Sequence, residues 1–206
     1  MKILYHHRTA SKDGQAVHIE EMIHALKKRG HEVRVVAPGQ GSADGAGDGQ
    51  LGAKVGWVHR LKAVLPKALY ELLELGYSLV AYRRLAAAAR EFQPDVLYER
   101  YNLFLLSGLM LKRRTGIPML LEVNSPLVYE RCHYGGLALA GVGRWAEGTA
   151  WRGADYVLPV TEVLAGHVRD YGVPAQRIRV IPNGINVEQF ALAPTPDEAK
   201  RRLGLE

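Results

Sequence analysis

KILYHHRTASKDGQAVHIEEMIHALKKRGHEVRVVAP, residues 2–38, contains two short apolar segments on either side of a helical pattern. KILYHH at the start and HEVRVVAP at the end each predict a buried strand. Residues 15–29 between them predict a helix that ends at Gly30. Its apolar face consists of Ala16, Ile19, Met22, Ile23 and Leu26. A strand, helix and strand in so short a stretch predict two parallel strands joined by a right-handed crossover.

The same alternation continues along the chain. We expect residues 39–52 to be a flexible glycine-rich surface loop. The segment 53–65 is ambiguous and suits a short amphipathic helix. Beyond it, the hydrophobic patterns of helices and strands become clear. Helices are predicted at 67–92, 103–114, 137–152 and 162–171, and strands at 95–100, 117–124, 154–160 and 178–183. The expected fold class is therefore α/β, with a doubly wound, mostly parallel, Rossmann-like sheet.

The longest predicted helix, 67–92, is rich in leucine. We expect its apolar side chains to face the sheet and its charged side chains to face water. The inward set is Leu69, Leu72, Leu73, Leu79 and Val80, and the outward set is Glu71, Glu74 and Arg83.

Composition narrows the class of protein. The chain has 206 residues, of which 48% are hydrophobic and 23% charged, as in an ordinary globular protein. A single cysteine, Cys132, rules out an intrachain disulfide and favours a reducing, cytoplasmic setting. No apolar run approaches the roughly 20 residues of a spanning helix. The net charge of +6 comes without a zinc-finger spacing or an aromatic RNA-binding motif, so we expect no nucleic-acid partner.

Polar residues follow the predicted strands at their carboxyl ends. Glu99, Arg100, Glu122 and Asn124 occupy positions where packing alone needs no charge or amide. Because the carboxyl ends of parallel strands open into one crevice, these side chains predict a cleft for a polar small molecule. Glu122 interrupts an apolar strand, so it needs a partner, and Arg8 or Arg100 is the natural one.

The loop after the first strand places Asp13 and Gly14 at the start of a helix. A glycine there lets a ligand approach the backbone, and the free amides favour an anion. The alternative is that Asp13 only caps the helix and Gly14 only eases the turn. No Gly-x-Gly-x-x-Gly pattern follows the strand, which disfavours a nicotinamide or flavin enzyme.

A metal site is not expected. His18 and His24 are six residues apart, so they lie roughly 120° apart on a helix and cannot easily share an ion. Cys132 precedes His133, but no second cysteine pair supports zinc, and a lone cysteine is more often a packed residue than a nucleophile.

The motifs together resemble the N-terminal, acceptor-side half of a retaining glycosyltransferase of the GT-B fold, family 4. The resemblance covers essentially the whole chain. Besides residues 2–38, its carriers are PDVLYERYN (94–102), GIPMLLEVNSPL (116–127), GADYVLPVTEVL (153–164) and YGVPAQRIRVIPNGINVEQF (171–190). The last of these is the most specific, since in this family such a segment precedes the linker to a second Rossmann-like domain.

The resemblance implies a Rossmann-like acceptor-binding domain at 1–190, a hinge at Asn183 and Gly184, and the start of an interdomain linker and helix at 191–206. It implies that a nucleotide-sugar is the co-substrate, that no cofactor or metal is needed, and that Asp13, Gly14 and Gln15 approach the donor diphosphate. The acceptor would be a saccharide or lipid-linked molecule. The residues expected to bind it are Arg8, His18, Glu99, Arg100 and Tyr129.

Two features depart from the family pattern. Many members have a histidine where this chain has Asn124, which can hydrogen-bond a sugar but cannot transfer protons near neutral pH. Glu122 and Asn124 therefore stay as catalytic candidates without an assigned step. The C-terminal, donor-binding domain is absent from the sequence, so we expect this chain alone to be inactive.

Parts of the sequence also fit two other functions. Residues 54–67 combine cations with Trp57, Val58 and Leu61, so the chain could bind the inner face of a membrane as a peripheral module. An ordinary packed helix is the alternative there. Another GT-B enzyme, such as a sugar-nucleotide epimerase, is disfavoured because the acid–base groups that its chemistry would need are not found at the strand ends.

Overall fold

The computed structural model describes residues 1–9, 14–38, 65–184 and 194–204. The predicted loop at 39–52, nearly all of the segments 53–65 and 54–67, and Asp13 lie outside the described residues. So does the part of the linker between 185 and 193.

Five parallel strands form one sheet. They are β1 (Lys2–His6), β2 (Glu32–Val36), β3 (Val96–Arg100), β4 (Met119–Val123) and β5 (Tyr156–Pro159), in the spatial order β2-β1-β3-β4-β5. The order reverses between β1 and β3, which is where a doubly wound sheet opens a crevice at its carboxyl edge. The predicted fold class is confirmed.

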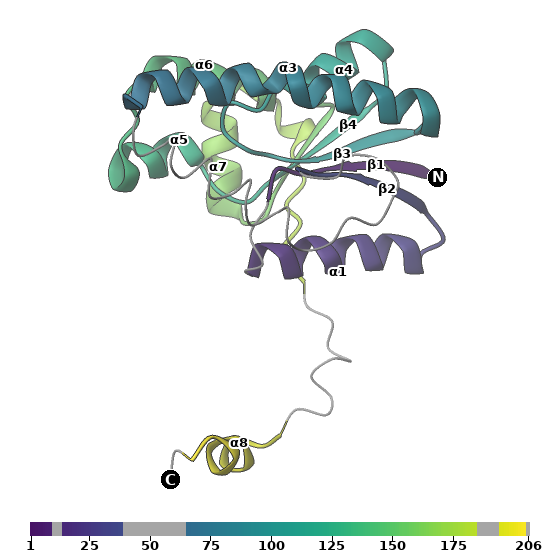
Figure 1. The fold of residues 1–206 in the computed structure, drawn as a ribbon, viewed down its shortest axis with the longest axis vertical. Coiled ribbons are helices and arrows are strands. Elements are labelled where there is room, and N and C mark those ends of the chain that lie inside the picture. Colours follow the sequence, from purple (N-terminus) through teal and green to yellow (C-terminus); the bar gives the residue numbers. More distant parts are fainter. Residues whose placement is uncertain (10–13, 39–64, 185–193, 205–206) are drawn as a thin grey trace.

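Helices cover both faces of the sheet (Figure 1). On one face lies α1 (Gly14–Lys28), and on the other lie α3 (Lys67–Phe92), α4 (Ser107–Thr115) and α6 (Ala140–Gly153). The remaining helical segments are α5 (Leu127–Glu130), the π-helical turn η1 (Arg131–Gly135), α7 (Glu162–Asp170), the short 3-10 turn η2 (Ala175–Arg177) and α8 (Pro196–Leu203). Among the described residues, no helix is long and apolar enough to cross a membrane.

Each face of the sheet has its own hydrophobic core. The larger core packs β-strand residues such as Leu97 and Leu121 against Leu85 of α3 and Trp151 of α6, all of which are inaccessible to solvent. The smaller core packs Tyr5 and Tyr98 against α1. Alternate strand residues supply the two cores, as expected for a sheet that is covered on both sides.

Several predicted boundaries were wrong. The helix predicted at 103–114 begins at Ser107, because Phe104 has a φ of 64° and interrupts the helical backbone. The segment predicted as a strand at 178–183 runs beside β5 but forms only one bridge, between Val157 and Ile178. Two backbone hydrogen bonds from this segment, Arg179 N to Val157 O and Ile181 N to Pro159 O, each measure 3.0 Å.

The predicted orientation of α3 was wrong: the side that was expected to face the sheet is exposed, and the side that was expected to face water is buried. Glu71 and Glu74 are buried, with 4% and 7% of their surfaces exposed, whereas Leu69, Leu72, Leu73, Leu79 and Val80 are 45–57% exposed. Arg83 is exposed, as predicted. Specific partners hold the buried glutamates: Glu71 accepts hydrogen bonds from the backbone amides of Ala138 (2.8 Å) and Leu139 (2.7 Å), just before α6 begins. A carboxylate at that place complements the positive end of the helix.

The predicted C-terminal helix is present as α8. Thr195 caps it through a reciprocal capping box with Glu198, and Gly204 ends it in the left-handed conformation. None of its residues is buried, and it lies apart from the sheet in Figure 1.

Candidate functional site

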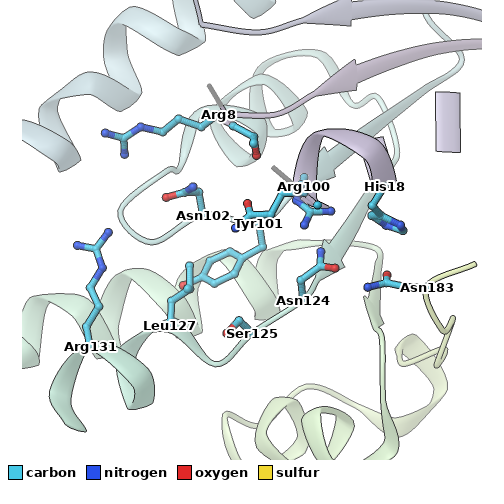
Figure 2. A pocket seen from close by; sticks show the side chains of 13 residues that line it. Arg8, His18, Arg100, Tyr101, Asn102, Asn124, Ser125, Leu127, Arg131 and Asn183 are labelled. Carbon is cyan, nitrogen blue, oxygen red and sulfur yellow. The ribbon is translucent and has the colours of Figure 1, made fainter. Parts of the chain in front are cut away.

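A polar cleft of about 480 Å³ opens at the carboxyl edge of the sheet. Figure 2 shows its lining side chains, which come from the end of β3, the loops after β1, β3 and β4, the start of α1, the segments α5 and η1, and the stretch after η2. The lining residues are Arg8, Thr9, Gly14, Gln15, His18, Arg100, Tyr101, Asn102, Asn124, Ser125, Leu127, Arg131 and Asn183. Within this described lining there are three arginines and no carboxylate, so the cleft suits a ligand rich in oxygen and negative charge.

Glu122 lies directly behind this wall, at the end of β4, and is 3% exposed. One carboxylate oxygen, Oε1, accepts hydrogen bonds from Arg100 Nη1 (2.5 Å) and Asn124 Nδ2 (2.5 Å), and lies 3.2 Å from His18 Nε2. The other oxygen, Oε2, accepts a hydrogen bond of 2.9 Å from the Tyr98 hydroxyl. Glu122 thus orients three side chains that line the cleft, and the expected pairing with Arg100 is confirmed.

These contacts decide the charge of Glu122. Burial by itself would raise the pKa of the carboxyl, but hydrogen bonds from His18 and Asn124, the charge of Arg100 and the hydrogen bond from Tyr98 outweigh it. The net pKa lies below its ordinary value, so the group is ionised at neutral pH. A carboxylate with every oxygen occupied is suited to holding its neighbours in place, not to exchanging protons.

A second buried carboxylate, Glu74 of α3, supports the other end of the cleft. Arg131 donates two hydrogen bonds to it, of 2.7 and 3.3 Å, and Arg8 Nη2 lies 3.6 Å from Glu74 Oε1. In Figure 2 the Arg8 and Arg131 guanidiniums lie at the end of the cleft opposite His18 and Asn183. Two cations share one carboxylate here, and Arg8 Nη1 is buried without a hydrogen-bond partner among the described residues. Glu71 also acts on Arg131 through its charge, so what distinguishes this end is its two guanidinium groups and not a net positive charge.

Gly14 begins α1 at the edge of the cleft, and Gln15 follows it. A Cβ atom built on Gly14 would meet nothing within 4 Å, so the fold itself does not require a glycine at this position. The absence of a side chain leaves the first turn of the helix open to the cleft. This arrangement agrees with the predicted approach of an anion, while Asp13 lies outside the described residues.

Not every predicted site residue lines the cleft. Arg8, Gln15, His18, Arg100, Asn124 and Asn183 do, together with Gly14. Glu99 is instead buried, with its Oε2 2.5 Å from His6 Nδ1. Tyr129 is half exposed and stacks near His133, with ring centroids 4.1 Å apart, and Gly184 is exposed just beyond Asn183.

Six lining residues were missed by sequence reasoning, namely Thr9, Tyr101, Asn102, Ser125, Leu127 and Arg131. Asn102 and Ser125 stand in the strand-end segments YERYN and EVNSP, so the rule that polar residues after strands line the crevice could have found them. Arg131 was not among the residues expected to bind a ligand. Its pairing with Glu74, 57 residues away in sequence, depends on the tertiary fold, and no local pattern indicates it.

Within the described part of the chain, no three His, Cys, Asp or Glu side chains are grouped so that they could hold a metal ion. The Cys132 side chain is exposed and forms no disulfide bond.

Solved structures share this fold at low sequence identity. Sucrose-phosphate synthase from Thermosynechococcus elongatus superposes with a TM-score of 0.72 at 14% identity, covering 100% of this chain and 53% of that one. UDP-GlcNAc 2-epimerase from Neisseria meningitidis, bound to UDP-GlcNAc, gives 0.61 at 11% identity, covering 99% and 54%. HepE from Anabaena, in complex with UDP, gives 0.57 at 13%, covering 99% and 50%.

Because these neighbours include both a synthase and an epimerase, the likeness establishes the fold and leaves the reaction open. The chain spans about half the length of each of them. Among curated proteins, none matches the sequence. The family comparison is more specific, since the model of Glycosyltransferase Family 4 matches residues 12–189, which include β2 to β5 and most of the cleft-lining residues. The chain belongs to Glycosyltransferase Family 4.

Proposed function

We propose that residues 1–190 are the acceptor-side domain of a retaining glycosyltransferase. The enzyme would move a sugar from a nucleotide-sugar donor to a saccharide or lipid-linked acceptor. The observation that carries the proposal is the cleft, in which the open first turn of α1 faces a wall with three arginines and no carboxylate among its described residues. Membership of Glycosyltransferase Family 4 supports the reaction class.

The donor diphosphate is assigned to the α1 end of the cleft. Gly14 and Gln15 stand there, and backbone amides at a helix start stabilise an anion without a metal. Asp13, which was also expected there, lies outside the described residues. HepE has been solved with UDP and with UDP-glucose, and this supports a nucleotide-sugar as the co-substrate of a protein with this fold. We propose that no metal or cofactor takes part.

The acceptor is assigned to the rest of the cleft. Arg8, Arg100 and His18 were expected there, and Arg131 and Asn102 join them. Asn124 would hydrogen-bond a sugar hydroxyl, and Glu122 would act as a positioning residue that holds Arg100, Asn124 and His18. Glu99 and Tyr129 do not line the cleft, so the proposal gives them no contact with the acceptor.

A donor-binding half is needed to complete this enzyme. We propose that it follows the hinge at Asn183 and Gly184, with 191–206 as the linker, and closes over the cleft. Most of the charge stabilisation at the leaving diphosphate would come from that half. We place the enzyme on the cytoplasmic side, where nucleotide-sugars would reach it.

Gly14→Ala tests the donor assignment. The added methyl group meets nothing in the folded chain, so it leaves stability unchanged or slightly higher. It does obstruct a ligand that touches the backbone. With the donor-binding half present, we expect sugar transfer from radiolabelled UDP-sugars to fall by at least about 100-fold, as for a misplaced reactant.

Gly76→Ala is the matched control, because a Cβ there also meets nothing within 4 Å and Gly76 lies on the exposed face of α3, away from the cleft lining. It should keep full activity. Equal activity of the Gly14→Ala and Gly76→Ala enzymes would contradict the donor assignment.

The chain of residues 1–206 by itself should not transfer sugar. We expect no detectable turnover with a panel of nucleotide-sugars and only weak binding of UDP, seen as NMR shifts of the Gly14 and Gln15 amides. Robust turnover by the purified chain would refute the proposal that a second half is required.

A further inference from the structure

The outward face of α3 is apolar. Leu69, Leu72, Leu73, Leu79 and Val80, which we call the α3 outer face, are 45–57% exposed and fall within three to four helical turns. No described element packs over them. A contiguous group of half-exposed aliphatic side chains on one helix is uncommon on a protein that stays fully in water, and it indicates a surface that something covers.

The helix does not need these leucines for its own packing. Its buried stripe is Glu71, Glu74, Ser78, Ala81, Leu85, Ala89 and Phe92, spaced three or four residues apart. The polar members of that stripe are satisfied: Ser78 Oγ, for example, donates to Phe104 O (2.7 Å) and accepts from Leu106 N (2.9 Å). The apolar residues of the first half of α3 are therefore available for an external contact.

The exposed charged residues of α3 are mostly positive. The exposed cations of α3 are Lys67, Arg83, Arg84 and Arg90, and those of the neighbouring helices α4 and α6 are Arg113, Arg114, Arg144 and Arg152. Among the described residues of these three helices, Glu91 is the only exposed carboxylate.

We propose that the α3 outer face docks on an anionic lipid surface, with Leu69, Leu72, Leu73, Leu79 and Val80 entering the headgroup region and Arg83 and Arg84 contacting lipid phosphates. Charge complementarity selects this occupant. A second copy bound face to face would bring the two sets of cations together, whereas an anionic bilayer neutralises them.

The position of this face also suits a lipid-linked substrate. Glu74, on the inner side of the same turns, holds the cleft residues Arg8 and Arg131. Docking would thus bring one end of the cleft near the membrane surface. The inference does not rest on the proposed transferase activity, because lipid binding is measured without any nucleotide-sugar.

The test uses the purified chain and sedimentation with two kinds of vesicle, pure phosphatidylcholine and a mixture with about one third phosphatidylglycerol. We expect binding to the anionic vesicles that weakens as salt is added. Leu72→Gln/Leu79→Gln should lower the partition coefficient at least about tenfold. Val17→Gln/Val163→Gln, which changes two exposed aliphatic residues on α1 and α7, is the matched control and should bind like the wild type.

Two charge-reversal variants, one on α3 and one on α1, test whether the vesicles bind this particular face or are attracted to the net positive charge of the protein. Arg83→Glu/Arg84→Glu should weaken binding by about 25-fold or more at low salt, at about fivefold for each cation removed. Lys27→Glu/Arg29→Glu, at the end of α1, changes the net charge equally and should have a much smaller effect.

Four outcomes would overturn the proposal. They are no binding to anionic vesicles, equal loss in the leucine variant and its control, equal loss in the two charge variants, and a dimer in solution that Leu72→Gln/Leu79→Gln dissociates. Circular dichroism and thermal unfolding verify that each variant is folded, which is expected because all the changed side chains are exposed.

Discussion

The carboxylate of Glu122 stabilises the fold at the place where it shapes the cleft. Glu122→Gln keeps the size of the side chain and removes its charge, which leaves the buried Arg100 guanidinium without a counter-ion. We expect the free energy of unfolding at pH 7 to fall by about 3 kcal/mol. Urea denaturation followed by circular dichroism measures it. A change below about 1 kcal/mol would contradict the positioning role.

The loss of stability caused by Glu122→Gln should depend on pH in a definite direction. The folded-state pKa of Glu122 lies below its ordinary value of 4.5, so its contribution is complete above that pH and is lost as the pH falls through the lowered pKa. The deficit of Glu122→Gln relative to wild type should therefore shrink between about pH 6 and pH 3.

Glu147 serves as a control, because its pKa is shifted in the opposite direction from that of Glu122. Burial raises its pKa above 4.5, against the hydrogen bonds that it accepts from Tyr171, Tyr101 and the backbone amide of Val128. Its contribution is complete below 4.5 and is lost as the pH rises through the raised pKa. The deficit of Glu147→Gln should then shrink as the pH rises. Parallel pH profiles for the two variants would show that one of these charge assignments is wrong.

Gly108 at the start of α4 depends on its missing side chain. A Cβ built there lies 2.5 Å from Glu99 Oε2, and Glu99 is itself buried against His6. Gly108→Ala should displace that carboxylate and destabilise the chain by about 1–3 kcal/mol, despite the better helix propensity of alanine. Gly166→Ala in α7, where a Cβ meets nothing within 4 Å, should be neutral or stabilising. Thermal unfolding of the two variants measures the difference, and equal stabilities would show that Glu99 yields without cost.

At the scale of the element, hydrophobic periodicity predicted the existence and type of the main strands and helices. It failed on the orientation of α3, because the rule that leucines face inward assumes a purely apolar interface. The sheet-facing side of α3 instead satisfies polar groups of distant segments: Glu71 binds the amides before α6, Glu74 binds Arg131, and Ser78 binds the chain around Phe104. These partners are remote in sequence, so no window along α3 reveals them.

The inverted orientation makes a direct prediction about stability. Leu85 is fully buried in the larger core, whereas Leu79 is 57% exposed. Leu85→Ala should cost about 2–5 kcal/mol of unfolding free energy, while Leu79→Ala should cost less than about 0.5 kcal/mol. Urea denaturation of both variants decides the orientation of the helix. A larger loss for Leu79→Ala would restore the orientation expected from sequence.

At the scale of the whole molecule, the cleft could be located from sequence because topology alone brings strand ends together. The loops after the first, third and fourth predicted strands do meet there, and most of the expected residues line the cleft. The exact lining could not be predicted, since it depends on side-chain direction. Glu99 and Arg100 are neighbours in sequence, but in a strand their side chains point to opposite faces, so only Arg100 reaches the cleft.

The C-terminal boundary of the sheet domain can be argued from the contacts that the residues after η2 make with β5 and the core. Ile178 is buried in the larger core, and Arg179 and Ile181 donate backbone hydrogen bonds to β5. α8 has no buried residue. A chain that ends at residue 193, and so lacks only α8 and the residues beside it, should therefore unfold within about 0.5 kcal/mol of the full chain. A chain that ends at residue 177 should lose about 3–4 kcal/mol, from one buried isoleucine and two hydrogen bonds. Denaturation of the two truncated chains measures both values, and a marked loss on removing residues 194–206 alone would mean that α8 packs against the sheet domain.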